Sequence, residues 1–185
     1  MQDELSSRPN SLRLPGFDYA QPGFYFVTIC SKERRYLFGS VKDYQCHLSS
    51  LGKLIQESWL AMPEWFPMVT LDQFVIMPNH IHAILQLDTT EKSGSPPTLS
   101  TVIGSFKSAV SRRAHESLLL PQQQAVWQRG YFDHIVRTES SLLHLRQYIF
   151  DNPAQWHLDK LNSSAVRDNR ATHGVAPTLS LSSNT

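Results

Sequence analysis

The first half of the chain alternates between apolar patterns typical of strands and of helices. Residues 24–30 (FYFVTIC) are aromatic and β-branched, which predicts a first strand. Apolar residues then recur at helical spacing and predict an amphipathic helix that ends at Pro63. This helical stripe comprises Tyr44, Leu48, Leu51, Ile55 and Trp59. Two β-rich segments, interrupted at Met77-Pro78-Asn79, predict a hairpin with strands near 69–77 and 80–87.

The second half continues this alternation after a polar, breaker-rich loop at 88–97. The apolar stripe of a second helix consists of Leu99, Val102, Ile103, Phe106 and Val110. Residues 126–136 predict one or two strands, with Gly130 as a bulge or turn. A third helix is predicted to begin after Thr138, its N-cap, and to end at Pro153. Its core-facing residues are Leu142, Leu145 and Ile149.

These elements predict one α+β domain, with helices on one face of a mainly antiparallel sheet. We place this catalytic domain at residues 24–161. The polar residues 1–23, broken by prolines, predict an extended or mobile N-terminal arm. The serine-rich residues 162–185 predict a flexible tail, because they contain too few apolar side chains to form a core.

Composition excludes some classes of protein. A hydrophobic share of 41% in 185 residues is enough for one core, so a second domain is not needed. The formal net charge of +1 argues against a protein that coats DNA nonspecifically. No apolar run approaches the roughly 20 residues that span a bilayer and no secretory signal pattern is visible, so we expect a cytoplasmic protein. The two cysteines lack C-x-x-C spacing, which indicates neither a zinc cluster nor a disulfide framework.

The sharpest candidate for chemistry is the pair His80 and His82. On a strand both imidazoles point to one face, while Ile81 points to the other face and can enter the core. Two neutral imidazoles on one face can share a metal ion, but a third ligand must come from elsewhere. The alternative is that both histidines are surface residues or hydrogen-bonded structural residues.

Tyr148 and Asn152 form a second candidate, because a spacing of four on the predicted third helix places them on one face. A metal bound to Asn152 would lie one helical turn from the phenol oxygen, which suits a nucleophile beside a Lewis acid. Tyrosine has a free pKa of about 10, so it is a weak nucleophile at neutral pH unless a nearby cation helps. The alternatives are a packing tyrosine and an asparagine that only ends the helix.

Basic and aromatic residues of the second half are candidates for contacts with DNA. Cationic side chains neutralise phosphates, and the candidates are Lys107, Arg112, Arg113, Arg129 and Arg137. Unpaired bases could stack on Trp127, Tyr131 or Phe132, although core packing is an equal alternative for each ring. Asp133 and His134 could assist the metal or the proton transfer, or could form a buried structural pair.

Three segments together resemble the REP-associated tyrosine transposases. These are relatives of the IS200/IS605-type single-tyrosine transposases, within the wider group of His-hydrophobic-His endonucleases. The segments are FVIMPNHIHAIL, YFDHIVR and RQYIFDNPAQW, and the opening DYAQPGFYFVTICSKERRYLFG also resembles the first strand of the family. The resemblance covers about residues 12–157, and its strength lies in the order and spacing of the motifs.

The resemblance implies a ferredoxin-like antiparallel sheet in which His80 and His82 bind a metal, Tyr148 is the nucleophile and Asn152 is the third ligand. Insertion-sequence relatives often have glutamine at the last position, whereas asparagine matches the REP-associated branch. The implied metal is Mg²⁺ or Mn²⁺. The implied substrate is single-stranded DNA with imperfect palindromes, cut beside a hairpin to leave a 5′-phosphotyrosine and a free 3′-hydroxyl. The resemblance also implies a protein of the bacterial nucleoid that acts as a monomer, with dimers typical of the insertion-sequence branch.

Two other functions stay open on the sequence. A nucleic-acid-binding module could hold hairpin DNA on the same sheet without cutting it, although the presence of the tyrosine and all three proposed ligands argues against this. A metal hydrolase of small substrates would need another ligand or a carboxylate general base near the histidines, and the sequence offers no obvious one.

Overall fold

The computed structural model describes residues 21–88 and 97–162. Most of the predicted arm and tail, and nearly all of the predicted loop at 88–97, lie outside these residues. Two boundaries differ slightly from the prediction. The first strand begins at Gly23, and Asn162, which we assigned to the tail, is buried and therefore belongs to the domain.

Four antiparallel strands form the main sheet, in the order β4-β5-β1-β6. They are β1 (Gly23–Cys30), β4 (Val69–Met77), β5 (His80–Leu87) and β6 (Phe132–Val136). The hairpin of β4 and β5 has the predicted bounds, and the order strand, helix, two strands, helix, strand is ferredoxin-like. The predicted α+β class with an antiparallel sheet is therefore confirmed.

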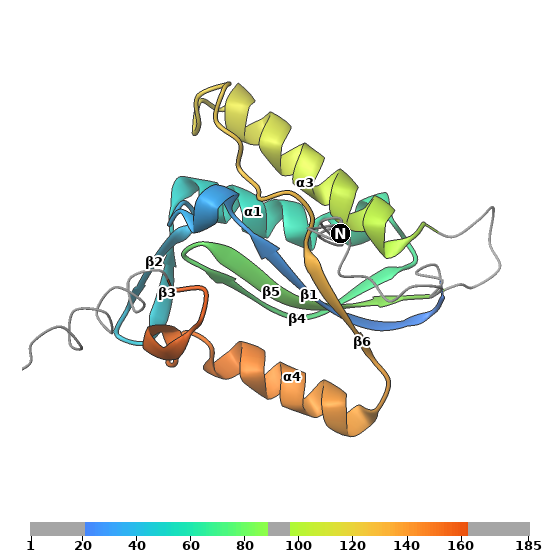
Figure 1. Ribbon diagram of the computed structural model, residues 1–185. Coiled ribbons are helices and arrows are strands. Elements are labelled where there is room, and N and C mark those ends of the chain that lie inside the picture. The colour runs from blue at the N-terminus through green and yellow to red at the C-terminus, as the bar shows by residue number, and fades with distance from the viewer. Residues whose placement is uncertain (1–20, 89–96, 163–185) are drawn as a thin grey trace, which may run out of the picture.

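Helices cover both faces of this sheet (Figure 1). One face carries α1 (Ser50–Leu60) and α3 (Leu99–Glu116), with the short α2 (Met62–Trp65) after α1. The opposite face carries α4 (Glu139–Asp151). The expectation that all helices share one face is thus wrong for α4. The physical reason is visible in β5, which is buried along nearly its whole length and so needs a cover on both sides.

The first predicted helix is shorter than its apolar stripe. Tyr44 lies in a turn and Leu48 in a strand of a small hairpin made of β2 (Gly39–Lys42) and β3 (Gln45–Leu48). Asp43 and Tyr44 have φ angles of 49° and 61°, the left-handed conformation of a tight two-residue hairpin turn. The helix begins only after Ser49, whose hydroxyl accepts a hydrogen bond from the backbone N–H of Gly52 at 3.0 Å.

The other predicted elements agree more closely with the structure. Pro63 lies in the first turn of α2 rather than at the end of α1, because proline fits an N-terminal helical position. Residues 126–136 contain only one strand, β6, and Gly130 precedes it at a φ of 74°. Thr138 caps α4 as predicted, since its hydroxyl accepts from the backbone N–H of Ser141 at 3.2 Å. Two one-turn 3-10 helices, η1 and η2, complete the described elements at Lys32–Arg34 and Trp156–Leu158.

Two apolar cores lie on the two sides of the sheet. The larger core joins the sheet to α1 and α3 and contains the inward rows of β1 and β5. The smaller core joins the sheet to α4 through Ile84, Val136, Leu142 and Ile149. Arg146 adds a forked contact to Asp72 of β4, with Nε at 3.0 Å and 3.2 Å from the two carboxylate oxygens. The helix that carries Tyr148 is therefore attached by few side chains.

We expect Ile149→Ala to lower the free energy of unfolding by about 3 kcal/mol, because the change leaves a cavity beneath α4. Urea denaturation followed by circular dichroism measures this loss. The matched control is Phe150→Ala on the exposed side of the same helix, which should change stability by no more than about 0.5 kcal/mol. Equal losses in the two variants would contradict the description of α4 packing.

Candidate active site

His80 and His82 lie side by side on the face of β5 that α4 covers. Their ring centroids are 4.4 Å apart, and both side chains are buried. Ile81 between them points into the larger core on the other face. The period of two along β5 therefore produces the predicted arrangement, with two imidazoles together and an apolar side chain opposite.

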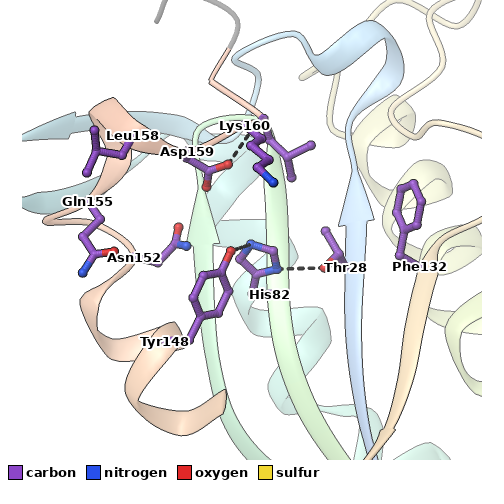
Figure 2. Close-up of a pocket in the computed structure, with 10 residues that line it drawn as sticks. Thr28, His82, Phe132, Tyr148, Asn152, Gln155, Leu158, Asp159 and Lys160 are labelled. Atoms are coloured by element: carbon purple, nitrogen blue, oxygen red, sulfur yellow. Dashed lines mark hydrogen bonds between the residues drawn. The ribbon is translucent and has the colours of Figure 1, made fainter. Parts of the chain in front are cut away.

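The side chain of Tyr148 projects from α4 toward these two histidines. Its phenol oxygen is 3.1 Å from Nε2 of His82, within hydrogen-bond distance. Asn152, at the C-cap of α4, is buried on the same side of the helix (Figure 2). The structure thus brings together the four residues that the sequence singled out. His82, Tyr148 and Asn152 line one pocket with Thr28, Phe132 and Asp159, and His80 lies directly behind His82.

Neighbouring side chains orient both imidazoles. Nδ1 of His82 is 2.8 Å from the Thr28 hydroxyl on β1, and Nδ1 of His80 is 2.8 Å from the Asn79 side-chain oxygen. Because an amide oxygen only accepts, His80 donates through Nδ1 and keeps a lone pair on Nε2. Such contacts fix ring orientation in metal-binding histidines.

Unsatisfied polar atoms gather in and beside this pocket. Among the described residues, four buried side-chain nitrogen or oxygen atoms have no hydrogen-bond partner, and three of them belong to His80, Asn152 and Asp159. An unpaired buried polar atom is costly, so three such atoms in one region suit a polar or charged ligand. Ligand atoms of His80, His82 and Asp159 lie within 4.8 Å of one another. Nitrogen and oxygen donors at this spacing fit a divalent metal ion.

Asp159 is the residue that the sequence reasoning missed. It lies in the turn after η2, with Oδ2 3.6 Å from Nε2 of His80. No periodicity in the sequence connects a residue of a turn with a distant strand, so spacing could not predict that Asp159 approaches His80. The available signal was a carboxylate shortly after Tyr148 in the sequence. Lys160 was missed for the same reason, and it also lines the pocket.

Burial keeps both histidines neutral. It lowers the pKa of His82 to about 3, and it lowers the pKa of His80 well below the usual value, with a further contribution from His82. Burial and the charge of Asp159 raise the pKa of Tyr148, while the Asn152 side chain lowers it. At neutral pH the imidazoles therefore offer lone pairs, and the phenol keeps its proton.

The predicted basic residues lie elsewhere. Lys107, Arg112 and Arg113 are on α3, across the sheet from α4 (Figure 1). Lys107 donates to the backbone carbonyls of Gln128 and Gly130 at 2.8 Å and 2.7 Å, and Arg113 contacts Ser58 and Glu57. Arg129 and Arg137 are exposed beside β6. A role in DNA binding stays a prediction for all five residues.

The structure separates the three candidate aromatic residues. Trp127 is buried and its indole donates to the Lys107 carbonyl at 3.0 Å, and Tyr131 packs against the larger core. Phe132 is 43% exposed and lines the pocket beside Thr28 (Figure 2). Asp133 and His134 do not line this pocket. Only Phe132 is therefore placed to meet a ligand at the site.

Comparison with known proteins identifies the family. A family model described as "Transposase IS200 like" matches residues 24–152. The chain belongs to the IS200-like transposase family. A Haemophilus influenzae protein without an assigned function is 37% identical over 167 residues, covering 82% of this chain and 91% of that protein. A candidate REP-associated tyrosine transposase of the same organism is 24% identical over 140 residues, covering 75% and 74%.

A solved structure of a REP-associated tyrosine transposase bound to a REP hairpin matches this IS200-like transposase with a TM-score of 0.52. The match has 18% identity and covers 75% of this chain and 71% of that chain, so it supports the fold. The resemblance found in the sequence is confirmed, and the protein has a transposase-like role. The family match includes both histidines, Tyr148 and Asn152, but ends before Asp159. None of the described helices has the length and apolar character needed to cross a membrane.

With divalent metal removed by chelation, we expect the free energy of unfolding to fall as the pH decreases from about 6.5 to about 4.5. Unfolded His82 takes up a proton below its usual pKa of 6.5, whereas folded His82, with a pKa of about 3, stays neutral. Protonation therefore favours the unfolded state in this window. Urea unfolding at a series of pH values measures the slope, and His82→Gln should make it shallower. An unchanged slope in this variant would contradict a neutral buried imidazole.

Proposed function

We propose that this IS200-like transposase cuts and rejoins single-stranded DNA beside a hairpin, with Tyr148 as nucleophile. The observation that carries the proposal is the 3.1 Å contact between the phenol oxygen and His82, one of two adjacent imidazoles. The cation would be Mg²⁺ or Mn²⁺, held by His80, His82 and Asn152. Support comes from their lone pairs and from the unpartnered oxygen of Asn152.

The chemistry would divide between the phenol and its surroundings. The phenol oxygen would attack the scissile phosphorus, forming a 5′-phosphotyrosine bond and breaking the bond to the 3′ oxygen. The phenol would release its proton to solvent, and the 3′ oxygen would take up a proton from solvent and leave as a hydroxyl. A bound divalent cation would supply polarisation of the phosphate and stabilise the negative charge of the transition state. Tyr148 would be held in place by α4, with its phenol oxygen beside the nitrogen of His82 that would bind the cation. A second 3′-hydroxyl could reverse the attack and join a new strand.

Two further pocket residues suit a DNA ligand. Phe132 is half-exposed on β6, where an unpaired base could stack on its ring. Lys160 is exposed and also lines the pocket, where its ammonium group could contact a phosphate. The solved relative is bound to a REP hairpin, which supports hairpin DNA as the substrate class. We further propose that the protein acts as a monomer.

Tyr148→Phe should eliminate the covalent protein–DNA adduct and leave DNA binding unchanged, because only the reacting oxygen is removed. The assay incubates protein with a labelled single-stranded hairpin library and Mn²⁺, then separates adducts under denaturing conditions and sequences the attached DNA. The matched control is Tyr44→Phe, which removes an exposed phenol outside the pocket and should keep full activity.

Two outcomes of this assay would reject the proposal. An adduct that persists in Tyr148→Phe would show that another residue is the nucleophile. Wild-type protein that binds the hairpins tightly but never cuts them with Mn²⁺ would instead identify a non-catalytic regulator that holds hairpin DNA.

Phe132→Ala should weaken binding of single-stranded DNA by about 5-fold to 100-fold, the range for one base stacked on an aromatic ring. Binding of fully paired duplex should change little, because its bases are not free to stack. Fluorescence anisotropy with matched single-stranded and duplex probes measures both. The control variant is Leu118→Ala, which removes an even more exposed apolar side chain just after α3, outside the pocket. Loss of affinity for both probes in Phe132→Ala would argue against stacking.

A further inference from the structure

The turn after α4 (residues 156–162) folds back against the start of β5. Two side chains far away in the sequence hold it: Asn79 donates to the Leu161 carbonyl at 2.7 Å, and the Tyr36 hydroxyl donates to the side-chain oxygen of Asn162 at 2.6 Å. Asn162 in turn donates to the Trp156 carbonyl at 2.9 Å. Residues 156–162 therefore belong to the folded domain.

This turn holds the Asp159 carboxylate in one orientation. Its Oδ1 accepts a hydrogen bond from the Leu161 backbone N–H at 2.7 Å. Its Oδ2 is buried without a partner and faces Nε2 of His80, which is also buried without a partner, at 3.6 Å. Two atoms that both carry lone pairs cannot satisfy each other by hydrogen bonding when the imidazole donates through Nδ1. A cation between or beside them would satisfy both.

Asn79 connects the two halves of this arrangement. Its side chain is fully buried, its oxygen accepts from Nδ1 of His80, and its nitrogen donates to the carbonyls of Leu161 and Arg34. One amide therefore sets both the ring orientation of His80 and the position of the turn that carries Asp159. An amide is suited to this task because it offers an acceptor and two donors at once.

We propose that Asp159 is a ligand of the divalent cation held by His80 and His82, and that Asn79 is the positioning residue that aligns Asp159 with His80. The inference rests on the proposed function, which supplies the cation. It adds a charged, hard oxygen ligand to a set of neutral imidazoles and an amide, which suits Mg²⁺ or Mn²⁺. The residue lies beyond the segment that the family match covers.

The test is Mn²⁺ binding to the full chain without DNA, measured by calorimetry. Asp159→Asn should weaken Mn²⁺ affinity by about 10-fold to 100-fold, the range for loss of a group that supports a metal site. The matched control is Asp151→Asn, which removes the same charge at the end of α4. Its carboxylate accepts from Gln147 and lies outside the pocket, so affinity should stay within about twofold.

Asn79→Ala separates positioning from simple loss of stability. We expect weaker Mn²⁺ binding together with a change in the His80 tautomer, seen in the nitrogen chemical shifts of the ring. In the Asp159→Asn background the same substitution should cost less affinity, because the ligand it aligns is already gone. If Asn79→Ala does not fold, the Asp159 variant alone decides whether Asp159 is a ligand.

The outcomes distinguish this inference from the proposed function. Normal Mn²⁺ affinity in Asp159→Asn, with binding lost in His82→Ala, would overturn the inference and leave the metal-dependent function standing. An equal loss in Asp151→Asn would also overturn it, since the effect would then come from charge at a distance. Wild-type protein that binds no Mn²⁺ would reject both.

Discussion

The site depends on one buried imidazole, that of His82, held between a strand and a helix. Its Nδ1 contacts Thr28 on β1 and its Nε2 contacts Tyr148 on α4, while its ring stacks on Phe26 at a centroid distance of 5.3 Å. These contacts connect parts of the chain that are 54 and 66 residues apart from His82. Because the ring is buried it stays neutral, so its lone pair can accept a hydrogen bond from the phenol or bind a metal.

The two faces of the sheet differ in the size of the apolar core that they bury. On one face α1 and α3 bury a large apolar core, which supplies most of the stability. On the other face α4 is attached by the smaller apolar core and by the contact of Arg146 with Asp72. Arg146 lies two residues before Tyr148 on the same helix. The free energy gained by burying the larger core can offset the desolvation cost of the unpaired polar atoms near the pocket. Such unpaired atoms are expected at a site that binds a ligand.

The segment matched by the IS200-like family includes most of the residues that the fold gathers at the pocket. The matched segment contains the two histidines, the tyrosine and Asn152; three of them line one pocket, and His80 lies beside His82. The turn after α4 lies beyond the matched segment and closes the pocket with Asp159 and Lys160. The fold therefore places a carboxylate and an ammonium group beside His82 and Tyr148, from a segment that the family match does not cover.

Local patterns were enough for much of this structure. The hairpin of β4 and β5, the shared face of His80 and His82, and the Thr138 cap of α4 follow from periods of two and 3.6 and from capping chemistry, which act between near neighbours. Tertiary structure alone decided that Leu48 lies in a strand, that α4 covers the opposite face and that Asp159 reaches His80. Those outcomes depend on which apolar surfaces still need a cover and on contacts between distant segments. The spacing of residues along the chain predicts neither the cover nor the contacts.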